Sequence, residues 1–341
     1  MEPDKKVLKR REFLEWLAVA GVGGIGSMHL NLPLFQNDIA RKDLPENRQL
    51  INTPQAQKIS FHIFSKHLQF LDYNGMAEVA AEIGFDGVDL SVRPGGHVLP
   101  EKVADDLPVA VAAIRQQGLL ATMMTTAITD AAGRITKNVL RTAGKLGISH
   151  YRTNWLWYDE NKGIEENLSD FKQILGALGK LNQELNITGD YQNHAGFNGH
   201  PLGSPIWDLA AVLDELNNPK LGCQYDIRHA TVEGATSWPL GLKRIYPHIN
   251  TLVVKDFKWD KRDGQWQIIN TPIGEGMVDF KKFFSLLKGY NISAPVSVHF
   301  EYDMPEHQKG LTKEQIRQQT IRLMQQDLNK LKAFRKQSGL E

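Results

Sequence analysis

The chain has 341 residues, of which 41% are hydrophobic, and its formal net charge is +1. This length suits one large barrel domain, and the even balance of charge lacks the basic excess that nucleic-acid binding requires. The single cysteine, Cys223, excludes an internal disulfide framework and any cysteine-based zinc site. We expect Cys223 to be a small buried residue on a strand.

Residues 1–30 resemble a twin-arginine export signal. Lys9-Arg10-Arg11-Glu12-Phe13-Leu14 precedes a weakly apolar run rich in Ala and Gly, which is too short for a comfortable membrane span. We therefore predict a periplasmic protein. No clear cleavage site follows, so a retained membrane anchor stays open, and a basic helix on a cytosolic protein is the alternative. Residues 31–58 carry Asn, Pro and Gln with little periodicity, which is typical of a linker.

From residue 59 the chain alternates between strand and helix patterns. The apolar runs predict strands at 59–64, 87–92, 119–125, 148–153, 187–193, 221–226, 251–256 and 295–301. Helical patterns follow at 75–83, 100–118, 131–146, 164–185, 205–216, 238–245, 278–288 and 312–337, and a polar excursion reaches residue 275 after the seventh strand. Eight such units predict an α/β fold, a single (β/α)8 TIM barrel over residues 59–341.

Polar side chains stand at the ends of several predicted strands, where a covered parallel strand should be apolar. The sixth strand runs into Asp226 and His229, and other strands end at Lys255, His194 and Glu301. Residues two apart share one face of a strand. Parity therefore joins four further side chains or pairs to this face, namely Gln192, His299, Ser91 with Arg93, and Arg152 with Asn154. Oxygen and imidazole donors gathered in one mouth suit Mn, Mg, Co or Zn.

The order of the motifs resembles the xylose isomerase-like barrel superfamily, the sugar phosphate isomerases and epimerases. The resemblance runs over about residues 59–304 and includes Gly84-Phe85-Asp86-Gly87-Val88-Asp89-Leu90 and Pro272-Ile273-Gly274-Glu275-Gly276. It implies a divalent metal held by groups from strands five to eight, with Asp226 and Glu301 on two ligand positions. It also implies that His229 contacts the substrate. The predicted ligand set is completed by Gln192 and His194.

Two positions depart from the family pattern. Gln192 stands where the resemblance implies Glu, and Val253 stands where it implies His. A Gln oxygen ligates weakly and Val cannot ligate, while the ammonium of Lys255 would repel a nearby ion. Two interpretations stay open: His194 or His299 replaces the lost imidazole, or Lys255 supplies the positive charge instead of an ion.

We predict an exported isomerase or epimerase that removes the proton α to the carbonyl of a keto-sugar and stabilises an enediolate. Glu301 and His194 are the candidates for proton transfer, and His229 and Lys255 for the carbonyl. The predicted substrate-binding residues are Arg93, His97, Arg152, His299 and Trp238. A keto-sugar lyase or hydratase and a non-catalytic sugar-binding barrel are the alternatives.

Each site residue also has a structural alternative. Asp226 and Glu301 could pair with Lys255 or Arg152 only to hold the barrel together, and the histidines and tryptophans could serve packing alone. A DNA-repair endonuclease on the same barrel is disfavoured by the charge and the few histidines. We expect a small-molecule sugar as partner, no nucleic acid and no membrane beyond the export signal, and leave a homo-oligomer open.

Overall fold

The computed structural model describes residues 59–196 and 199–340. The predicted export signal at 1–30 and the predicted linker at 31–58 lie outside the described residues. Within the described part of the chain, no helix is long and apolar enough to cross a membrane.

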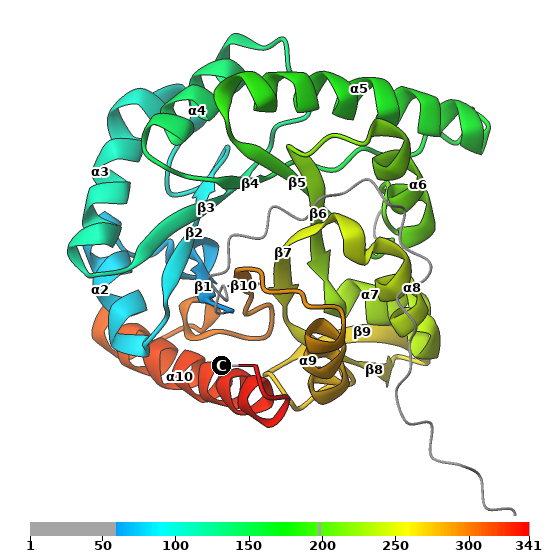
Figure 1. The fold of residues 1–341 in the computed structure, drawn as a ribbon. Helices are drawn as coiled ribbons and strands as arrows, with labels where there is room; N and C mark the ends of the chain where they lie inside the picture. Colours follow the sequence, from blue (N-terminus) through cyan, green and yellow to red (C-terminus); the bar gives the residue numbers. More distant parts are fainter. Residues whose placement is uncertain (1–58, 197–198, 341) are drawn as a thin grey trace, which may run out of the picture. The chain divides into compact units, whose positions relative to one another are not determined.

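Eight parallel strands close into a barrel, with the spatial order β1-β10-β7-β6-β5-β4-β3-β2 (Figure 1). Each strand is almost wholly buried, since barrel residues face either the central core or the helices. This confirms the predicted (β/α)8 barrel. The strands are β1 (Phe61–Phe64), β2 (Gly87–Val92), β3 (Leu120–Thr126), β4 (His150–Arg152), β5 (Thr188–Gln192), β6 (Leu221–Asp226), β7 (Ile249–Val254) and β10 (Val296–Val298).

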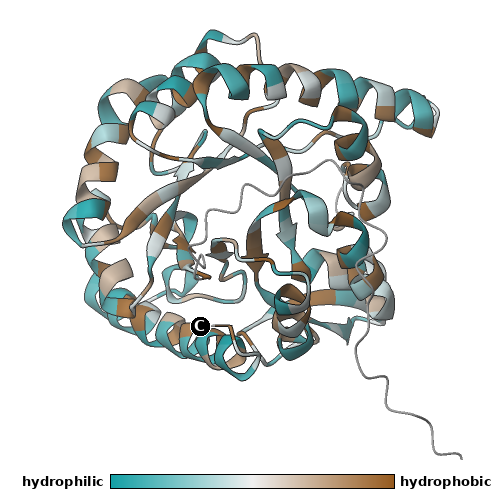
Figure 2. Ribbon diagram, viewed as in Figure 1, coloured by the Kyte–Doolittle hydropathy of each residue, from teal (hydrophilic) through white to brown (hydrophobic). Residues whose placement is uncertain are grey.

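Helices surround the sheet in a ring (Figure 1). Hydrophilic and hydrophobic stretches alternate along them (Figure 2), as expected of helices that pack one face on a sheet. Leu178, Leu242 and Phe283 are examples of their fully buried side chains. The ring helices are α2 (Tyr73–Ile83), α3 (Val103–Gln116), α4 (Arg134–Lys145), α5 (Ile164–Leu185), α6 (Ile206–Leu216), α8 (Trp238–Ile245), α9 (Phe280–Gly289) and α10 (Lys313–Gln337).

Three elements were not predicted. The helix α7 (Ile227–Gly234) starts directly after β6 and is capped by the Asp226 side chain. The excursion after β7 is an antiparallel hairpin of β8 (Asp256–Arg262) and β9 (Gln265–Thr271). Asp256 therefore begins the hairpin, and the barrel strand β7 ends two residues earlier than predicted.

The barrel closes through its last strand. β10 has only three residues, yet it pairs with β1 on one side and β7 on the other, with Val296 opposite both Phe61 and Leu252. The Val296 N–H also donates to Ser60 O at 2.8 Å. The predicted strand at 295–301 is thus cut short, and its polar end residues lie in the segment that leaves the barrel.

Candidate functional site

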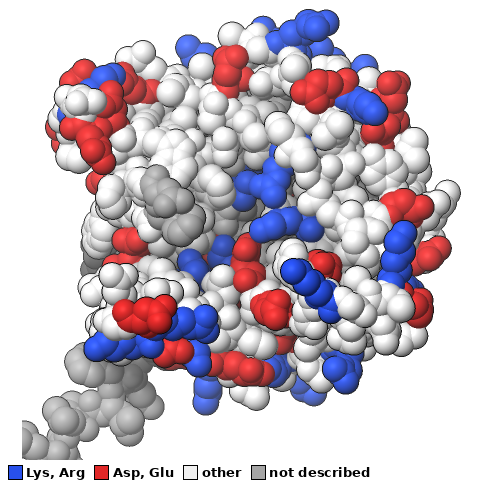
Figure 3. Space-filling view, turned by 180° about the vertical axis from the view of Figure 1, so that it is seen from behind, with Lys and Arg blue, Asp and Glu red and all other residues white. Residues whose placement is uncertain are grey.

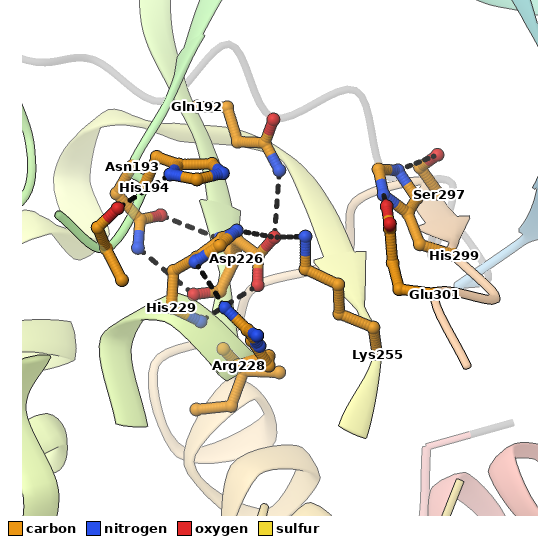
Figure 4. A network of polar contacts seen from close by, with 12 residues as sticks. Gln192, Asn193, His194, Asp226, Arg228, His229, Lys255, Ser297, His299 and Glu301 are labelled. Carbon is orange, nitrogen blue, oxygen red and sulfur yellow. Dashed lines mark hydrogen bonds and ion pairs between the residues drawn. The ribbon is translucent and has the colours of Figure 1, made fainter. Parts of the chain in front are cut away.

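Asp226 stands at the centre of the polar groups at the carboxyl ends of the strands (Figure 4). It is the last residue of β6 and also the N-cap of α7, where its Oδ1 accepts the His229 N–H at 3.1 Å. Its Oδ2 accepts the side-chain amide of Gln192 at 2.8 Å and lies 3.3 Å from Lys255 Nζ. The carboxylate is fully buried, so these donors replace the water it gives up on folding.

Lys255 follows β7 and carries a buried positive charge. Burial lowers the pKa of its ammonium, while the charges of Asp226 and Glu301 act in the opposite direction. The side chain of Val253, two residues earlier, is fully buried and apolar. The charge of the ammonium is therefore balanced by the carboxylates of Asp226 and Glu301, and β7 provides no imidazole beside it.

Gln192 and Arg152 extend this network across β5 and β4. Arg152 Nη1 donates to Gln192 Oε1 at 3.0 Å, and its guanidinium lies 4.6 Å from the centre of the Trp155 ring. Burial lowers the pKa of Arg152 to about 10, so it stays protonated at neutral pH. Both ends of the Gln192 amide are thus engaged, one with Arg152 and one with Asp226.

Two histidine rings lie against each other beside Asp226, with centroids 3.7 Å apart. His194 Nδ1 donates to the Ala195 carbonyl at 2.8 Å, which leaves Nε2 as an acceptor. His229 Nδ1 accepts from Arg228 Nη1 at 3.0 Å, so Nε2 carries the hydrogen, 3.6 Å from Asp226 Oδ2. The pair therefore presents one acceptor and one donor.

Both rings are neutral at pH 7. Burial and the nearby Lys255 lower the pKa of His194 to about 4. The same two causes, in the same order, hold the pKa of His229 well below 6.5. Neutral rings keep the roles assigned above, since a protonated imidazole has no acceptor.

In Figure 4, Glu301 lies on the side of Lys255 that is opposite Asp226. Its Oε2 is 3.4 Å from Lys66 Nζ and its Oε1 is 3.7 Å from His299 Nδ1. Its side chain is 28% exposed, whereas that of Asp226 is fully buried. Glu301 is therefore the carboxylate that a substrate can reach.

Trp238, which we predicted to bind the substrate, is buried in this structure. It is the first residue of α8 and is 6% exposed, packed 6.5 Å from the Phe283 ring of α9 with Lys282 Nζ over its face. This burial favours the structural alternative given above, in which the tryptophan serves packing.

Arg93 and His97 lie in the segment after β2, which is tied to the barrel. His97 Nδ1 bonds Ser65 Oγ at 3.1 Å, and its N–H donates to Ser91 Oγ at 3.0 Å. The Arg93 guanidinium is 5.4 Å from the Phe64 ring. Arg93 is near the mouth, since the charges of Asp89 and Glu301 both affect its pKa, which burial lowers. His97 instead anchors the segment.

A divalent ion needs oxygen or imidazole donors turned toward one point. Asp226 Oδ2 instead faces the Gln192 amide nitrogen and the Lys255 ammonium, and Gln192 Oε1 is bonded to Arg152. Within residues 59–196 and 199–340, no group of three or more His, Cys, Asp or Glu side chains is placed to hold a metal. The donor set predicted from Asp226, Glu301, Gln192 and His194 therefore does not fit a divalent ion.

Three residues of the site were not among the predicted site residues, namely Asn270, Asp89 and Ser297. Asn270 of β9 accepts from Arg228 Nη2 at 2.9 Å and donates to Glu301 O at 3.2 Å, which ties the hairpin to the mouth. Asp89 and Ser297 bond each other inside the barrel at 2.6 Å. Inward parity in β2 could have indicated Asp89, but nothing in the sequence marks Asn270.

Lys, Arg, Asp and Glu are scattered over the face shown in Figure 3, without a broad area of one sign. This agrees with the formal net charge of +1.

A closed parallel barrel with converging polar groups at the carboxyl ends of its strands defines the class of (β/α)8 proteins whose ligands bind at that mouth. Residues 77–326 match the family model described as xylose isomerase-like TIM barrel. The chain belongs to this family. A search of curated proteins finds no match.

Solved structures with the same fold include three of distant sequence. D-allulose 3-epimerase from Methylomonas sp. is 15% identical, with 82% of this chain and 98% of that chain covered and a TM-score of 0.60. 3-Keto-D-glucoside 4-epimerase from E. coli is 12% identical, with coverages of 81% and 100% and a TM-score of 0.61. The probable 3-DHS dehydratase from Bacillus anthracis is 12% identical, with coverages of 78% and 98% and a TM-score of 0.58.

Proposed function

We propose that this protein is an isomerase or epimerase that moves a proton on the carbon next to the carbonyl of a keto-sugar. The observation that carries the proposal is a buried ammonium with a proton acceptor on either side. Lys255 lies between His194 and Glu301 in Figure 4, and its charge affects the pKa of both. Two proteins of similar fold, D-allulose 3-epimerase and 3-keto-D-glucoside 4-epimerase, carry names that agree with this class of reaction.

In the proposed reaction the substrate carbonyl oxygen lies against Lys255 Nζ and the Nε2–H of His229. One acceptor, Glu301 or His194 Nε2, takes the proton from the adjacent carbon. The electron pair of the broken C–H bond forms the enediolate, whose negative oxygen is stabilised by the ammonium. A proton then returns to carbon, and the carbonyl re-forms.

Two acceptors on different strands suit an epimerase in particular. Inversion at carbon requires removal of a proton from one face of the enediolate and delivery to the other. His194 follows β5 and Glu301 follows β10, so they approach the mouth from different segments. General acid–base groups of this kind typically contribute about 10²- to 10⁴-fold each to the rate.

The remaining polar groups orient the sugar. Arg152 and Arg93 are cationic donors suited to sugar hydroxyls, and the half-buried Trp155 ring stands against both Arg152 and His194. The proposed reaction uses no divalent ion, because the Asp226 carboxylate is already compensated by Lys255 and Gln192. The export signal expected at 1–30 leads us to propose a free or glycosidic sugar outside the cytoplasm rather than a sugar phosphate.

A lyase or hydratase is the second candidate. It is favoured by the donor at His229 Nε2, which lies beside Lys255 and could protonate a leaving hydroxyl of the same enediolate. A dehydratase also stands among the structures of similar fold. The two reactions share the first proton abstraction and differ in whether water leaves.

The test is proton–deuterium exchange in D2O, followed by NMR, with free ketoses and 3-keto-glycosides. We expect deuterium at the carbon next to the carbonyl, together with the isomer or epimer. Glu301→Gln and His194→Gln should each lower the exchange rate, with Glu306→Gln, a half-buried glutamate outside the site, as the control. Loss of water from the sugar would indicate the lyase. Sugar binding without exchange would refute catalysis and leave the sugar-binding barrel.

A further inference from the structure

A continuous row of polar side chains joins the inside of the barrel to Glu301. Ser297 Oγ of β10 donates to Asp89 Oδ2 of β2 at 2.6 Å, and His299 Nε2 lies 3.2 Å from Ser297 Oγ. The other ring nitrogen, Nδ1, is 3.7 Å from Glu301 Oε1. Asp89, Ser297 and His299 are all at most 4% exposed, so water does not compete for these contacts.

The direction of each hydrogen bond follows from Asp89. Both Ser297 and Thr125 place hydroxyls against its carboxylate, Thr125 Oγ1 at 3.1 Å, which marks Asp89 as an acceptor. The 2.6 Å contact has the length of a hydroxyl bonded to an ionised oxygen. Burial raises the pKa of Asp89, but the nearby Arg152 favours the carboxylate. The one proton of Ser297 is therefore used, and His299 Nε2 must supply the hydrogen of its own contact.

The ring of His299 is held in place and neutral. It stacks on Phe64 with centroids 4.6 Å apart, and burial keeps its pKa well below 6.5. A neutral ring with hydrogen on Nε2 has a lone pair on Nδ1, and this atom makes no hydrogen bond within the described residues. Two acceptors, Nδ1 and Glu301 Oε1, thus face each other with no donor between them.

We propose that Asp89 and Ser297 are positioning residues that hold His299 in the tautomer whose Nδ1 accepts a hydrogen bond from Glu301 after Glu301 has taken the substrate proton. The proposal rests on the proton abstraction proposed above. The proton leaves carbon with the C–H electron pair left on the enediolate, binds the Glu301 carboxylate, and its O–H then donates to Nδ1. The opposite tautomer would point an N–H at Glu301 and compete with the incoming proton.

The tautomer can be read without any substrate, from the ring nitrogens of ¹⁵N-histidine-labelled protein, with His299→Gln used to identify the signals. We expect hydrogen on Nε2 and a bare Nδ1 in the full chain. In Asp89→Asn the carboxamide can donate to Ser297 Oγ, which turns the serine proton toward Nε2 and moves the ring hydrogen to Nδ1. Hydrogen on Nδ1 in the unaltered protein would overturn the proposal whatever the variant does.

Kinetics test the consequence of the tautomer. Asp89→Asn should lower kcat about 100-fold while KM changes less than about 2-fold, because the variant alters proton acceptance and not the sugar contacts. Asp190→Asn is the matched control: Asp190 is an equally buried carboxylate on β5, bonded to Thr251 and His150. It should leave kcat and the His299 signals unchanged.

Ser297→Ala removes the hydroxyl that accepts from His299 Nε2, so its effect does not depend on a reversed hydrogen bond. We expect a mixture of the two His299 tautomers and a lower kcat in this variant. A changed tautomer with full kcat would refute the positioning role. Absence of exchange in the unaltered protein would refute the proposed function instead, and the NMR result would still decide the tautomer.

Discussion

The Asp226–Lys255 pair is the residue-scale feature on which the site depends. Both charges are buried and each compensates the other, and the Asp226 carboxylate also accepts the side-chain amide of Gln192. Such a pair adds little net stability compared with apolar residues, but removal of one partner leaves a buried charge uncompensated.

Lys255→Met should therefore destabilise the barrel by about 3 kcal/mol and lower the rate of exchange at least 100-fold. Urea unfolding and the D2O exchange assay measure the two effects. Lys258→Met, at an exposed position on β8, is the control and should change neither. A Lys255→Met protein that keeps its exchange rate would show that the ammonium does not stabilise the enediolate.

The same arrangement predicts the response to chelators. Because Lys255 and Gln192 already satisfy Asp226, dialysis against EDTA should change neither the melting temperature nor the exchange rate. Elemental analysis of the purified protein should find less than one divalent ion per chain. A stoichiometric ion whose removal abolishes exchange would contradict our assignment of Lys255.

Buried neutral histidines make stability depend on pH. Burial lowers the pKa of His62 on β1 to about 4, although Asp86 acts in the opposite direction. The folded state therefore resists protonation, while the unfolded chain takes up a proton near pH 6.5. The stability from His62 is present above pH 6.5 and is lost as pH falls toward 4. The loss by pH 5 is up to about 2 kcal/mol.

Urea unfolding at pH 7.5 and pH 5 measures this loss. His62→Gln should reduce the difference between the two pH values, while His200→Gln, at an exposed position, should not. If the free energy of unfolding of His62→Gln differed as much between the two pH values as that of the unaltered protein, other groups would cause the pH dependence.

At the scale of elements, Asp256 fastens the hairpin and the segment after it. Its carboxylate accepts four backbone N–H groups, those of Phe257, Gly274, Gly276 and Val278, at 2.8 to 3.1 Å. From the sequence, residue 256 was expected to be the last of the seventh barrel strand. In the structure it instead organises the chain that carries Asn270 to Arg228 and Glu301.

Asp256→Ala should leave those four N–H groups without their acceptor and destabilise the protein by at least about 2 kcal/mol. It should also raise KM, because the hairpin loses its fixed position beside Glu301. Urea unfolding and exchange kinetics measure both. Asp260→Ala, farther along the hairpin and half-exposed, should do neither; a similar loss in both variants would refute the role of Asp256.

The bounds of helices and strands were predictable where the sequence carries residues that start or end such elements. The bounds of β2, β6, α5 and α8 agree with the prediction, since glycine and proline mark their ends or apolar periodicity is strong. The helix α7 was missed because Asp226 and His229 were interpreted as a polar strand end, whereas Asp226 also caps a helix. The hairpin was missed because its strands are largely exposed and lack an apolar face.

The site was only partly predictable for a related reason. Parity along strands brought Gln192, Lys255 and Asp226 together correctly, because neighbouring parallel strands share a register. Contacts between strands that are not paired with each other, such as β2 and β10 on either side of β1, depend on which interior side chains meet in three dimensions. Asp89 and Ser297 are separated by 208 residues, and no local pattern pairs them.

At the scale of the whole molecule, the barrel is closed by strand pairs and hydrogen bonds that lie entirely within the described residues. β1 and β10 meet directly, and Arg335 of α10 donates to Ile59 O at 2.7 Å. A chain that begins at residue 59 should therefore fold with one cooperative unfolding transition and the same exchange activity as the full chain. Circular dichroism and the D2O assay test this, and a fragment that does not fold would show that residues 1–58 contribute to the barrel.

The bond between Asp89 and Ser297 links the first third of the chain to its last quarter. A ribosome exposes β2 long before it makes β10, so a growing chain carries Asp89 with no hydroxyl from Ser297 to orient. His299 and Glu301 emerge only in the final stretch of synthesis. The acid–base centre proposed above is therefore complete only on finished molecules, because the last strand both closes the barrel and precedes His299 and Glu301.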